Sequence, residues 1–398
     1  MFAKRISALF LSILFLLCAC STGTQEEASV ELTLGTLLSE ENNIEQEAIA
    51  SFNQQDKGYT VKVVHYEDLS ALNTAILAGK GPDLLHIYNI PYAAYQQKGL
   101  FLPLNGIVGT LSDGDYFENI LSLTSYDNTY PTVIISYYFD YLQGCKSVIG
   151  DITSWNLEEF ISTMEGSDVF EKNLRGDILY FMLAANLDRF IDPNTAEVRF
   201  NTESFVDLLE FSNLFVATYD GVSWDNWPAL VQASHPWSPS FNIDQSAYEE
   251  LGDSMVVINY PSDDFQGPSV NTSFMGLELA AMSTSQHQEE SLAFIEYMLS
   301  EEAQNHLENF PVNRASFATR VEEDRQLLLE EKQIELTAED EEYIYSVFES
   351  ADNIMRVDAA VMDIVLEEAA SYFNGNKTAE DVTEIIQDRV STYVAEQQ

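Results

Sequence analysis

Basic residues are scarce in this sequence. Its 398 residues include 18 lysines and arginines against 65 aspartates and glutamates, which gives a formal net charge of −47 at pH 7. A chain with this balance presents no basic surface to a phosphate backbone, so nucleic-acid binding is excluded as a function. Anionic lipid is not an electrostatic partner either, and an anionic solute would need basic side chains gathered locally.

Cysteine and histidine are also rare, with three and five residues. Cys18 and Cys20 lie near the amino end, which leaves Cys145 as the one cysteine in the body of the chain. A disulfide framework is therefore not expected, and a chain of this length can bury a sizeable core instead. We interpret Cys145 as a small buried hydrophobic residue, and we predict no metal site and no cofactor.

The motifs of common hydrolases are missing as well. The chain has no Gly-x-Ser-x-Gly turn and no His-Glu-x-x-His helix, and Gly79-Lys80-Gly81 is too short to cradle a phosphate. A secreted carbohydrate-active enzyme with paired carboxylates stays as an alternative, because 65 acidic residues do not exclude such a pair by number. We predict that the protein is not an enzyme.

The most specific signal lies in the first twenty residues. Lys4 and Arg5 precede an apolar run at residues 6–17, which only two serines interrupt. The run is shorter than the roughly 20 residues that a membrane span requires, so it predicts a secretory signal peptide.

The end of this run resembles a bacterial lipobox, with the residues Leu17-Cys18-Ala19-Cys20. The resemblance implies a signal peptide at residues 1–19, a lipid on Cys20 and an anchor on the extracellular face of the cytoplasmic membrane. There are two alternatives to a lipid on Cys20: the lipid is attached to Cys18, or a plain signal peptide is cleaved further downstream. Residues 20–28 are small, polar and acidic, which predicts a flexible lipidated tether.

Strand patterns and helix patterns alternate in the next part of the chain. Short alternating or β-branched runs predict strands, and apolar residues at four-residue spacing predict helices between them. This order predicts an α/β fold with a parallel sheet covered by helices. The strands are expected at residues 30–34, 59–64 and 83–88, and the helices at 43–55 and 69–78.

Three loops follow the predicted strands, at residues 35–37, 66–68 and 88–92. In open α/β sheets, ligands bind beyond the carboxyl ends of the strands, so we expect these loops to face a common cleft.

From residue 151 the pattern becomes mostly helical. Asn156 and Glu159 predict a capping box at the start of a helix, and Trp155 before it is interpreted as a hydrophobic staple. Residues 224–237 hold three tryptophans in an irregular stretch, and tryptophan on a loop is costly to expose without a purpose. Residues 321–398 are predicted to be almost wholly helical.

Several segments resemble, in the same order, the family 1 extracellular solute-binding proteins, the group that includes maltose-binding protein. They include the turn Ala78-Gly79-Lys80-Gly81-Pro82-Asp83 and the helix "SLAFIEYMLSEEAQ"; the others lie at residues 43–64, 99–104, 154–160 and 372–397. The resemblance implies a two-lobe periplasmic-binding-protein-like fold of class II type. In such a fold each lobe is a sheet flanked by helices, and the ligand cleft lies between the lobes.

The resemblance also implies bounds for the lobes. The first lobe is expected at residues 29–139 plus 262–312, and the second at 140–261 plus 313–398. By this resemblance, the function of the protein would be to capture a carbohydrate, a mono- or oligosaccharide, by closing the two lobes. The protein would then deliver the sugar to the permease subunits of an ABC importer, as a monomer.

A sugar site needs flat aromatic faces and polar side chains for the hydroxyl groups. Packing in the core is the competing role for each candidate. A binding protein for a cationic solute such as a polyamine, and a lipoprotein of this fold that works without a transporter, are alternatives. The candidate ligand-binding residues are Tyr88, Tyr92, Tyr138, Trp224, Trp227, Trp237 and Tyr260, with Glu67, Asp68, Asn89, Asp140 and Asp225 as polar partners.

Overall fold

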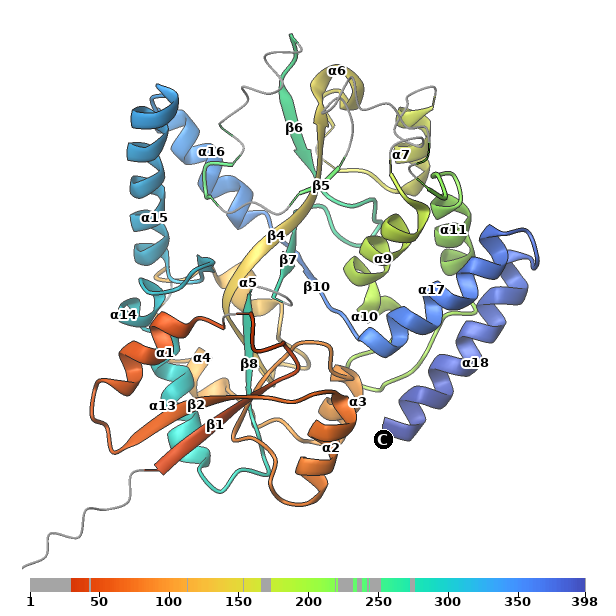
Figure 1. Ribbon diagram of the computed structural model, residues 1–398. Coiled ribbons are helices and arrows are strands. Elements are labelled where there is room, and N and C mark those ends of the chain that lie inside the picture. The colour runs from red at the N-terminus through yellow and green to blue at the C-terminus, as the bar shows by residue number, and fades with distance from the viewer. Residues whose placement is uncertain are drawn as a thin grey trace, which may run out of the picture.

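The computed structural model of the protein is an α/β structure with a ten-stranded sheet and helices packed around it (Figure 1). It describes residues 30–42, 44–112, 114–152, 154–165, 173–218, 220, 232–234, 238–241, 243, 252–272 and 276–397. Two large cores organise this part of the chain, and one long strand connects them.

The sheet of the first body has the strand order β2-β1-β3-β8-β4. β1 pairs in parallel with β2 and with β3, as the strand–helix pattern predicts, and β8 is antiparallel to both of its neighbours. The first four of these strands are β1 (Val30–Thr36), β2 (Tyr59–His65), β3 (Leu84–His86) and β8 (Leu277–Ala281).

Helices cover this sheet and share one core with it. Leu32 and Leu34 of β1 are fully buried in that core with Phe52 and Phe294, which come from two covering helices. The helices of this body are α1 (Gln46–Asn53), α2 (Leu69–Leu77), α3 (Tyr92–Gln97), α4 (Asn105–Val108), α5 (Glu118–Ser122), α13 (Gln288–Met298) and α14 (Glu301–Gln304).

β4 (Val133–Cys145) runs from the first body into the second (Figure 1). Its first half pairs with β8 and with the short β9 (Phe310–Pro311). Its middle pairs with β7 (Ser269–Asn271), and its second half pairs with β5 (Gln232–Ser234) and β6 (Met255–Ile258). One strand of 13 residues therefore belongs to both bodies.

The second body is mostly helical and has its own core. Trp155, Phe160 and Phe205 are buried there with Val382 and Val390 of the last helix. Its elements are α6 (Lys146–Ile149), α7 (Leu157–Met164), α9 (Arg175–Ala185), α10 (Leu187–Phe190), α11 (Glu203–Ser212), β10 (Asn353–Met355), α17 (Ala359–Phe373) and α18 (Ala379–Gln397).

The helices between β9 and β10 pack on the first body. Phe317 and Phe348 join the first core, and β10 then carries the chain across to the second body. The lobe bounds given above stay a prediction. The helices of this connection are α15 (Arg314–Leu327), the π-helix η1 (Leu328–Lys332) and α16 (Ala338–Glu349).

Local sequence signals are confirmed at several helix ends. Asn156 and Glu159 form the predicted capping box at the start of α7, and the Trp155 side chain before it is 1% exposed. Thr378 accepts a hydrogen bond from the amide of Asp381 at the start of α18, at 3.2 Å. α1 begins later than predicted, because Glu45 before it has the left-handed backbone angle φ of 39°.

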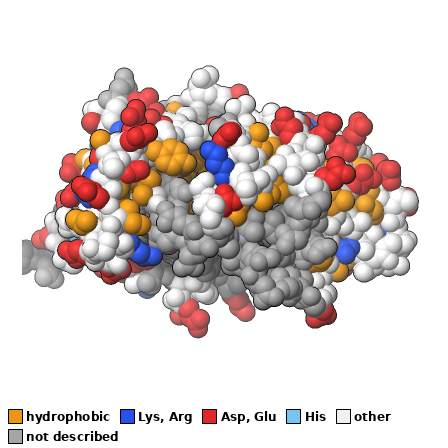
Figure 2. All heavy atoms as spheres, turned by 90° about the horizontal axis from the view of Figure 1, so that it is seen from above, with side chains coloured by type: hydrophobic (Ala, Val, Ile, Leu, Met, Phe, Trp, Pro, Cys, Tyr) orange, Lys and Arg blue, Asp and Glu red, His pale blue; other side chains and the backbone are white. Residues whose placement is uncertain are grey.

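Acidic side chains surround much of the face shown in Figure 2, and basic ones are few, as the composition predicts. Cys145 is 3% exposed, which confirms its prediction as a buried residue. Within the described ranges, no helix combines the length and the apolar character that crossing a membrane requires. The predicted signal peptide, lipobox and tether lie outside the described residues.

Candidate functional site

The loop after β3 (residues 87–91) is held in place by a carboxylate at the start of the strand. Asp83 accepts hydrogen bonds from the amide and the hydroxyl group of Thr33, at 2.8 and 2.9 Å, and from the hydroxyl of Ser285 at 2.6 Å. These bonds fix β3 between β1 and β8, so the loop that follows leaves the sheet at a defined place.

The turn before Asp83 explains the glycine that the sequence places there. Gly79 has a φ of 67°, in the left-handed region that favours glycine. Its amide donates to Ile76 O at 3.0 Å, and the amide of Lys80 donates to Ala75 O at 2.9 Å. This is a Schellman motif, which ends α2 as predicted and directs the chain into β3.

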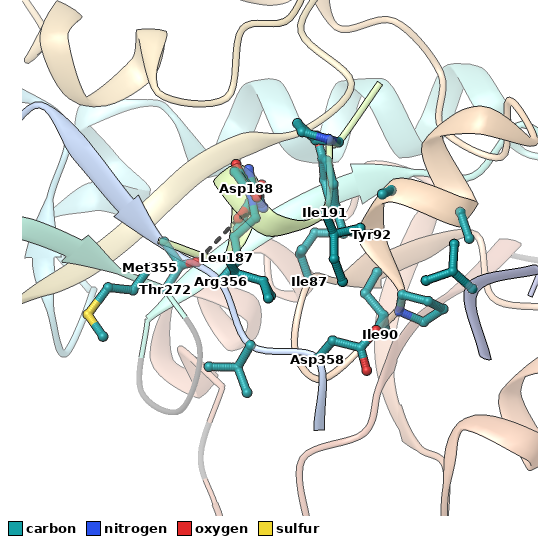
Figure 3. A pocket seen from close by; sticks show the side chains of 17 residues that line it. Ile87, Ile90, Tyr92, Leu187, Asp188, Ile191, Thr272, Met355, Arg356 and Asp358 are labelled. Carbon is teal, nitrogen blue, oxygen red and sulfur yellow. Dashed lines mark hydrogen bonds and ion pairs between the residues drawn. The ribbon is translucent and has the colours of Figure 1, made fainter. Parts of the chain in front are cut away.

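A small, partly open cavity, here called the inner cavity, lies between the two bodies. The loop after β3 contributes Ile87 and Ile90 to its wall, and the second body contributes Leu187 and Ile191. Further parts of the wall come from α3, from β8, from α18 and from the segment after β10, which includes Arg356 (Figure 3). Both bodies therefore build one cavity.

Arg356 is the central charge of the inner cavity, and its side chain is 6% exposed. Its Nη1 atom lies 3.1 Å from both carboxylate oxygens of Glu278, which belongs to the first body. Its Nε atom lies 3.5 Å from Asp188 of the second body. The guanidinium also lies over the ring of Tyr92, 4.0 Å from the ring centre, so one side chain contacts both bodies.

The carboxylates around Arg356 have further partners. Glu278 accepts hydrogen bonds from the hydroxyl groups of Thr132 and Thr272, at 2.5 and 3.2 Å. Asp188 accepts one from the hydroxyl of Tyr126 at 2.7 Å. A buried ion pair is tolerated when its remaining lone pairs are satisfied in this way.

Asp358 lines the same cavity and caps the first turn of α17. It accepts hydrogen bonds from the amide of Ala360 at 3.1 Å and from the hydroxyl of Tyr393 at 3.1 Å. Burial raises the pKa of this carboxyl to about 6, although the amide of Val361, the Tyr393 hydroxyl and the amide of Ala360 act in the opposite direction.

A second group of side chains, here called the aromatic end, lies between the bodies and is more open. Tyr88 from the loop after β3 and Tyr180 from α9 are both half-buried. Burial raises the pKa of Tyr180, and the neighbouring Tyr88 and Asp140 raise it further, which places the three polar groups near one another.

At the floor of the aromatic end, Tyr260 is buried and Phe181 is half-buried. The rings of Phe181 and Tyr260 stack with their centres 6.3 Å apart, and the Tyr260 hydroxyl has no hydrogen-bond partner among the described residues. Asp140 accepts a hydrogen bond from the side chain of Asn271 at 2.5 Å. Tyr138 and Asp140 both come from β4, the strand that the two bodies share.

A family model for bacterial extracellular solute-binding proteins matches residues 38–305. The chain belongs to this family. No curated protein matches its sequence.

Solved structures of low sequence identity share the fold of this solute-binding protein. The sugar-binding protein MalE from Xanthomonas citri has a TM-score of 0.60 and 16% identity, with 92% of this chain and 98% of that chain covered. The GacH receptor of Streptomyces glaucescens is also 16% identical and has a TM-score of 0.55, with 92% of this chain and 99% of that chain covered. The galacto-N-biose-/lacto-N-biose I-binding protein of Bifidobacterium longum has a TM-score of 0.55 and 14% identity. The match covers 93% of this chain and 98% of that chain. The fold is thus the two-lobe fold of periplasmic binding proteins.

The structure brings several of the predicted site residues of this solute-binding protein between the two bodies. Of these residues, Tyr92 lines the inner cavity. The others belong to the aromatic end or to the loop after β3 that borders it. The group consists of Tyr88, Asn89, Tyr92, Tyr138, Asp140 and Tyr260.

Two predicted polar residues lie elsewhere, and four cannot be placed. Glu67 and Asp68 are exposed after β2, where Asp68 accepts a hydrogen bond from the amide of Ala71 and caps α2. Trp224, Asp225, Trp227 and Trp237 lie outside the described residues.

Sequence reasoning missed Arg356, Asp188 and Tyr180. Arg356 carried a usable signal, since an arginine between Met355 and Val357 is unusual in a chain with so few basic residues. Asp188 and Tyr180 carried none, because an acidic residue and a tyrosine on helical segments are common in this sequence.

Proposed function

We propose that this protein is an extracellular solute-binding lipoprotein of an ABC importer that captures a mono- or oligosaccharide by closure of its two lobes. The observation that carries the proposal is that both bodies contribute side chains to the inner cavity and to the aromatic end. A ligand that touches both lobes stabilises the closed state by the extra contacts it makes there.

The chemistry of the aromatic end favours a carbohydrate. Tyr88 and Tyr180 offer half-buried rings for the apolar face of a sugar, while Asp140 beside Tyr180 is fully buried. The sugar-binding neighbours of the same fold support this choice. A cationic solute such as a polyamine is the second candidate, because the net charge of −47 suits it.

The amino end defines the rest of the proposal. Cleavage after residue 19 would leave Cys20 to carry the lipid, and residues 20–28 would tether the folded body at the extracellular face of the membrane. The protein would act as a monomer, deliver its sugar to the permease subunits and carry out no chemistry on it.

Binding can be tested with a thermal-shift screen against neutral sugars and polyamines, followed by titration calorimetry with the best ligand. We expect saturable binding of a sugar without formation of products. Replacement of Trp227 or Trp237 by alanine is expected to weaken binding about tenfold or more, while the melting temperature changes little. Tyr343→Ala, at an exposed tyrosine of α16, is the matched control.

Three results would contradict parts of this proposal. Turnover of an oligosaccharide would favour the enzyme, and binding of polyamines alone would favour the cationic solute. Unchanged affinity in both tryptophan variants would remove residues 224–237 from the ligand site.

A further inference from the structure

We propose that the inner cavity is a subsite for a neutral hydrogen-bond acceptor that carries an apolar substituent, and that the acetamido group of an N-acetylated sugar is the chemical group it selects. The inference rests on the proposed capture of a carbohydrate and names the class of sugar. It is built on the donor, the charges, the walls and the size of the cavity.

The donor is Arg356 Nη2. Two other nitrogens of this side chain face carboxylates, Nη1 toward Glu278 and Nε toward Asp188. Nη2 is buried and has no hydrogen-bond partner within the described part of the chain, although Arg356 lines the cavity. A buried donor without a partner is costly, so a ligand that brings an acceptor to this atom gains affinity by satisfying it.

The charges around Arg356 favour an acceptor that is neutral. Glu278, Asp188 and Asp358 all contribute carboxyl groups to the cavity wall, against the single positive charge of Arg356. A carboxylate on the ligand would face these like charges beside the buried side chains of Arg356 and Glu278. An ammonium group would bring no acceptor at all. A carbonyl oxygen satisfies the donor and adds no net charge.

The walls of the cavity favour an apolar group next to that oxygen. Ile87 and Ile90 of the loop after β3 line it together with Leu187 and Ile191 of the second body (Figure 3). A hydroxyl group on the ligand could also accept from Arg356, but it would leave these four side chains without an apolar contact. The methyl group of an acetamido group supplies that contact.

The size of the cavity excludes a whole sugar ring. It offers a volume of about 40 Å³ to groups of the size of water. Since one water needs on the order of 10–15 Å³ on this measure, roughly three heavy atoms fit. The carbonyl carbon, the oxygen and the methyl carbon of an acetamido group are three atoms. The loop at residues 87–92 borders both regions, so a ring held at the aromatic end can direct this substituent inward.

The test compares sugars that differ only in this group. Titration calorimetry measures the affinity of the full protein for N-acetylglucosamine against glucose, and for the β1,4-linked disaccharides of each. The same pairs are measured for N-acetylgalactosamine and galactose. We expect at least about tenfold tighter binding of the acetylated member in one pair or more. Arg356→Lys keeps a positive charge beside Glu278 but removes Nη2. We expect it to bring the ratio of the two affinities, acetylated over non-acetylated sugar, close to one.

Two further variants separate the subsite from a general effect on folding. Val357→Phe narrows the cavity from its half-buried edge and is expected to abolish the preference while glucose or galactose still binds. Arg189→Lys alters a neighbouring, exposed arginine that pairs with Asp264, and should leave the ratio unchanged.

The outcomes are distinct. Equal affinity for both members of every pair overturns the subsite but leaves carbohydrate capture intact. A preference that persists in both Arg356→Lys and Val357→Phe places the selecting group outside this cavity and also overturns it. If no sugar binds, the proposed function fails, and the subsite fails with it.

Discussion

The inner cavity and the aromatic end lie between the same two bodies but differ in how their polar groups are satisfied. In the inner cavity, Arg356 and Glu278 are 6% and 1% exposed, and their charges pair with each other. At the aromatic end, Tyr88 and Tyr180 are half-buried and belong to different bodies. The first region joins the bodies through buried charge, whereas the second leaves aromatic faces for a ligand.

This difference separates two roles that a binding protein needs. Removing one partner of a buried ion pair is costly because the other charge is left buried alone, so the fold should be sensitive to single substitutions at the inner cavity. The half-buried rings of Tyr88 and Tyr180 pack against the two cores on one side and leave part of their surface for contact with a ligand. Substitutions at the two regions should therefore have different consequences.

The largest expected effect is a loss of stability in Arg356→Met. Removal of the guanidinium leaves Glu278 charged and buried without its partner, which should cost about 3–5 kcal/mol in the free energy of unfolding. Urea denaturation measures this loss. The double variant Arg356→Met/Glu278→Gln is the control and should recover a large part of it. A cost below about 1 kcal/mol for the single variant would remove the stabilising role of this pair.

Stability should respond to pH in opposite directions at the two regions. His86 stacks on Tyr88 at the aromatic end, with the ring centres 5.8 Å apart, and burial lowers its pKa from 6.5 to about 4. The unfolded state then binds more protons, so stability falls as the pH drops from 6.5 to 4. Burial raises the pKa of Asp358 from 3.8 to about 6, so there stability falls as the pH rises from 4 to 6.

Each of these contributions amounts to up to about 3 kcal/mol, and in the wild-type protein they oppose each other. Urea denaturation at pH 4 and pH 6.5 separates them. His86→Gln should gain stability toward pH 4 relative to the wild type, and Asp358→Asn should lose it. The same pH response in both variants would contradict the assignment.

The smallest expected effect is at the aromatic end, and it concerns affinity. Tyr88→Ala and Tyr180→Ala should each weaken sugar binding about tenfold, which is ~1.4 kcal/mol, and should lower the free energy of unfolding by less than Arg356→Met does. Titration calorimetry with the sugar found in the screen measures the first quantity. Tyr88→Phe keeps the ring and should keep most of the affinity. If Tyr88→Ala binds as well as the wild type, the ring face is not part of the site.

Local sequence patterns predicted most elements at the beginning and the end of the chain, although β10 interrupts the last segment, which was predicted to be almost wholly helical. The strand at 30–34 and the helix at 69–78 were found with their ends shifted by two residues at most, because alternation, helical spacing and the Gly79 turn are local signals. β4 was not predicted. Its residues are buried on both faces along almost all of its length, so they show no alternation from which a strand can be recognised.

The candidate site shows the same division. Tyr88 and Tyr92 were accessible to prediction, since their loop follows a strand of a parallel sheet, where ligands usually bind. Their neighbours Tyr180 and Arg356 come from segments about 90 and 260 residues further along the chain, whose approach depends on how the second body packs.

The order of residues along the chain was enough to establish the α/β class, the family likeness and the acidic character of the surface. Each follows from local spacing, from motif order or from composition. Tertiary structure decided which charges meet: Arg356, Glu278 and Asp188 come from three distant segments and form one buried cluster. The reason is physical, since a buried charge is stable only beside partners that the folded chain brings to it, and no local pattern records those partners.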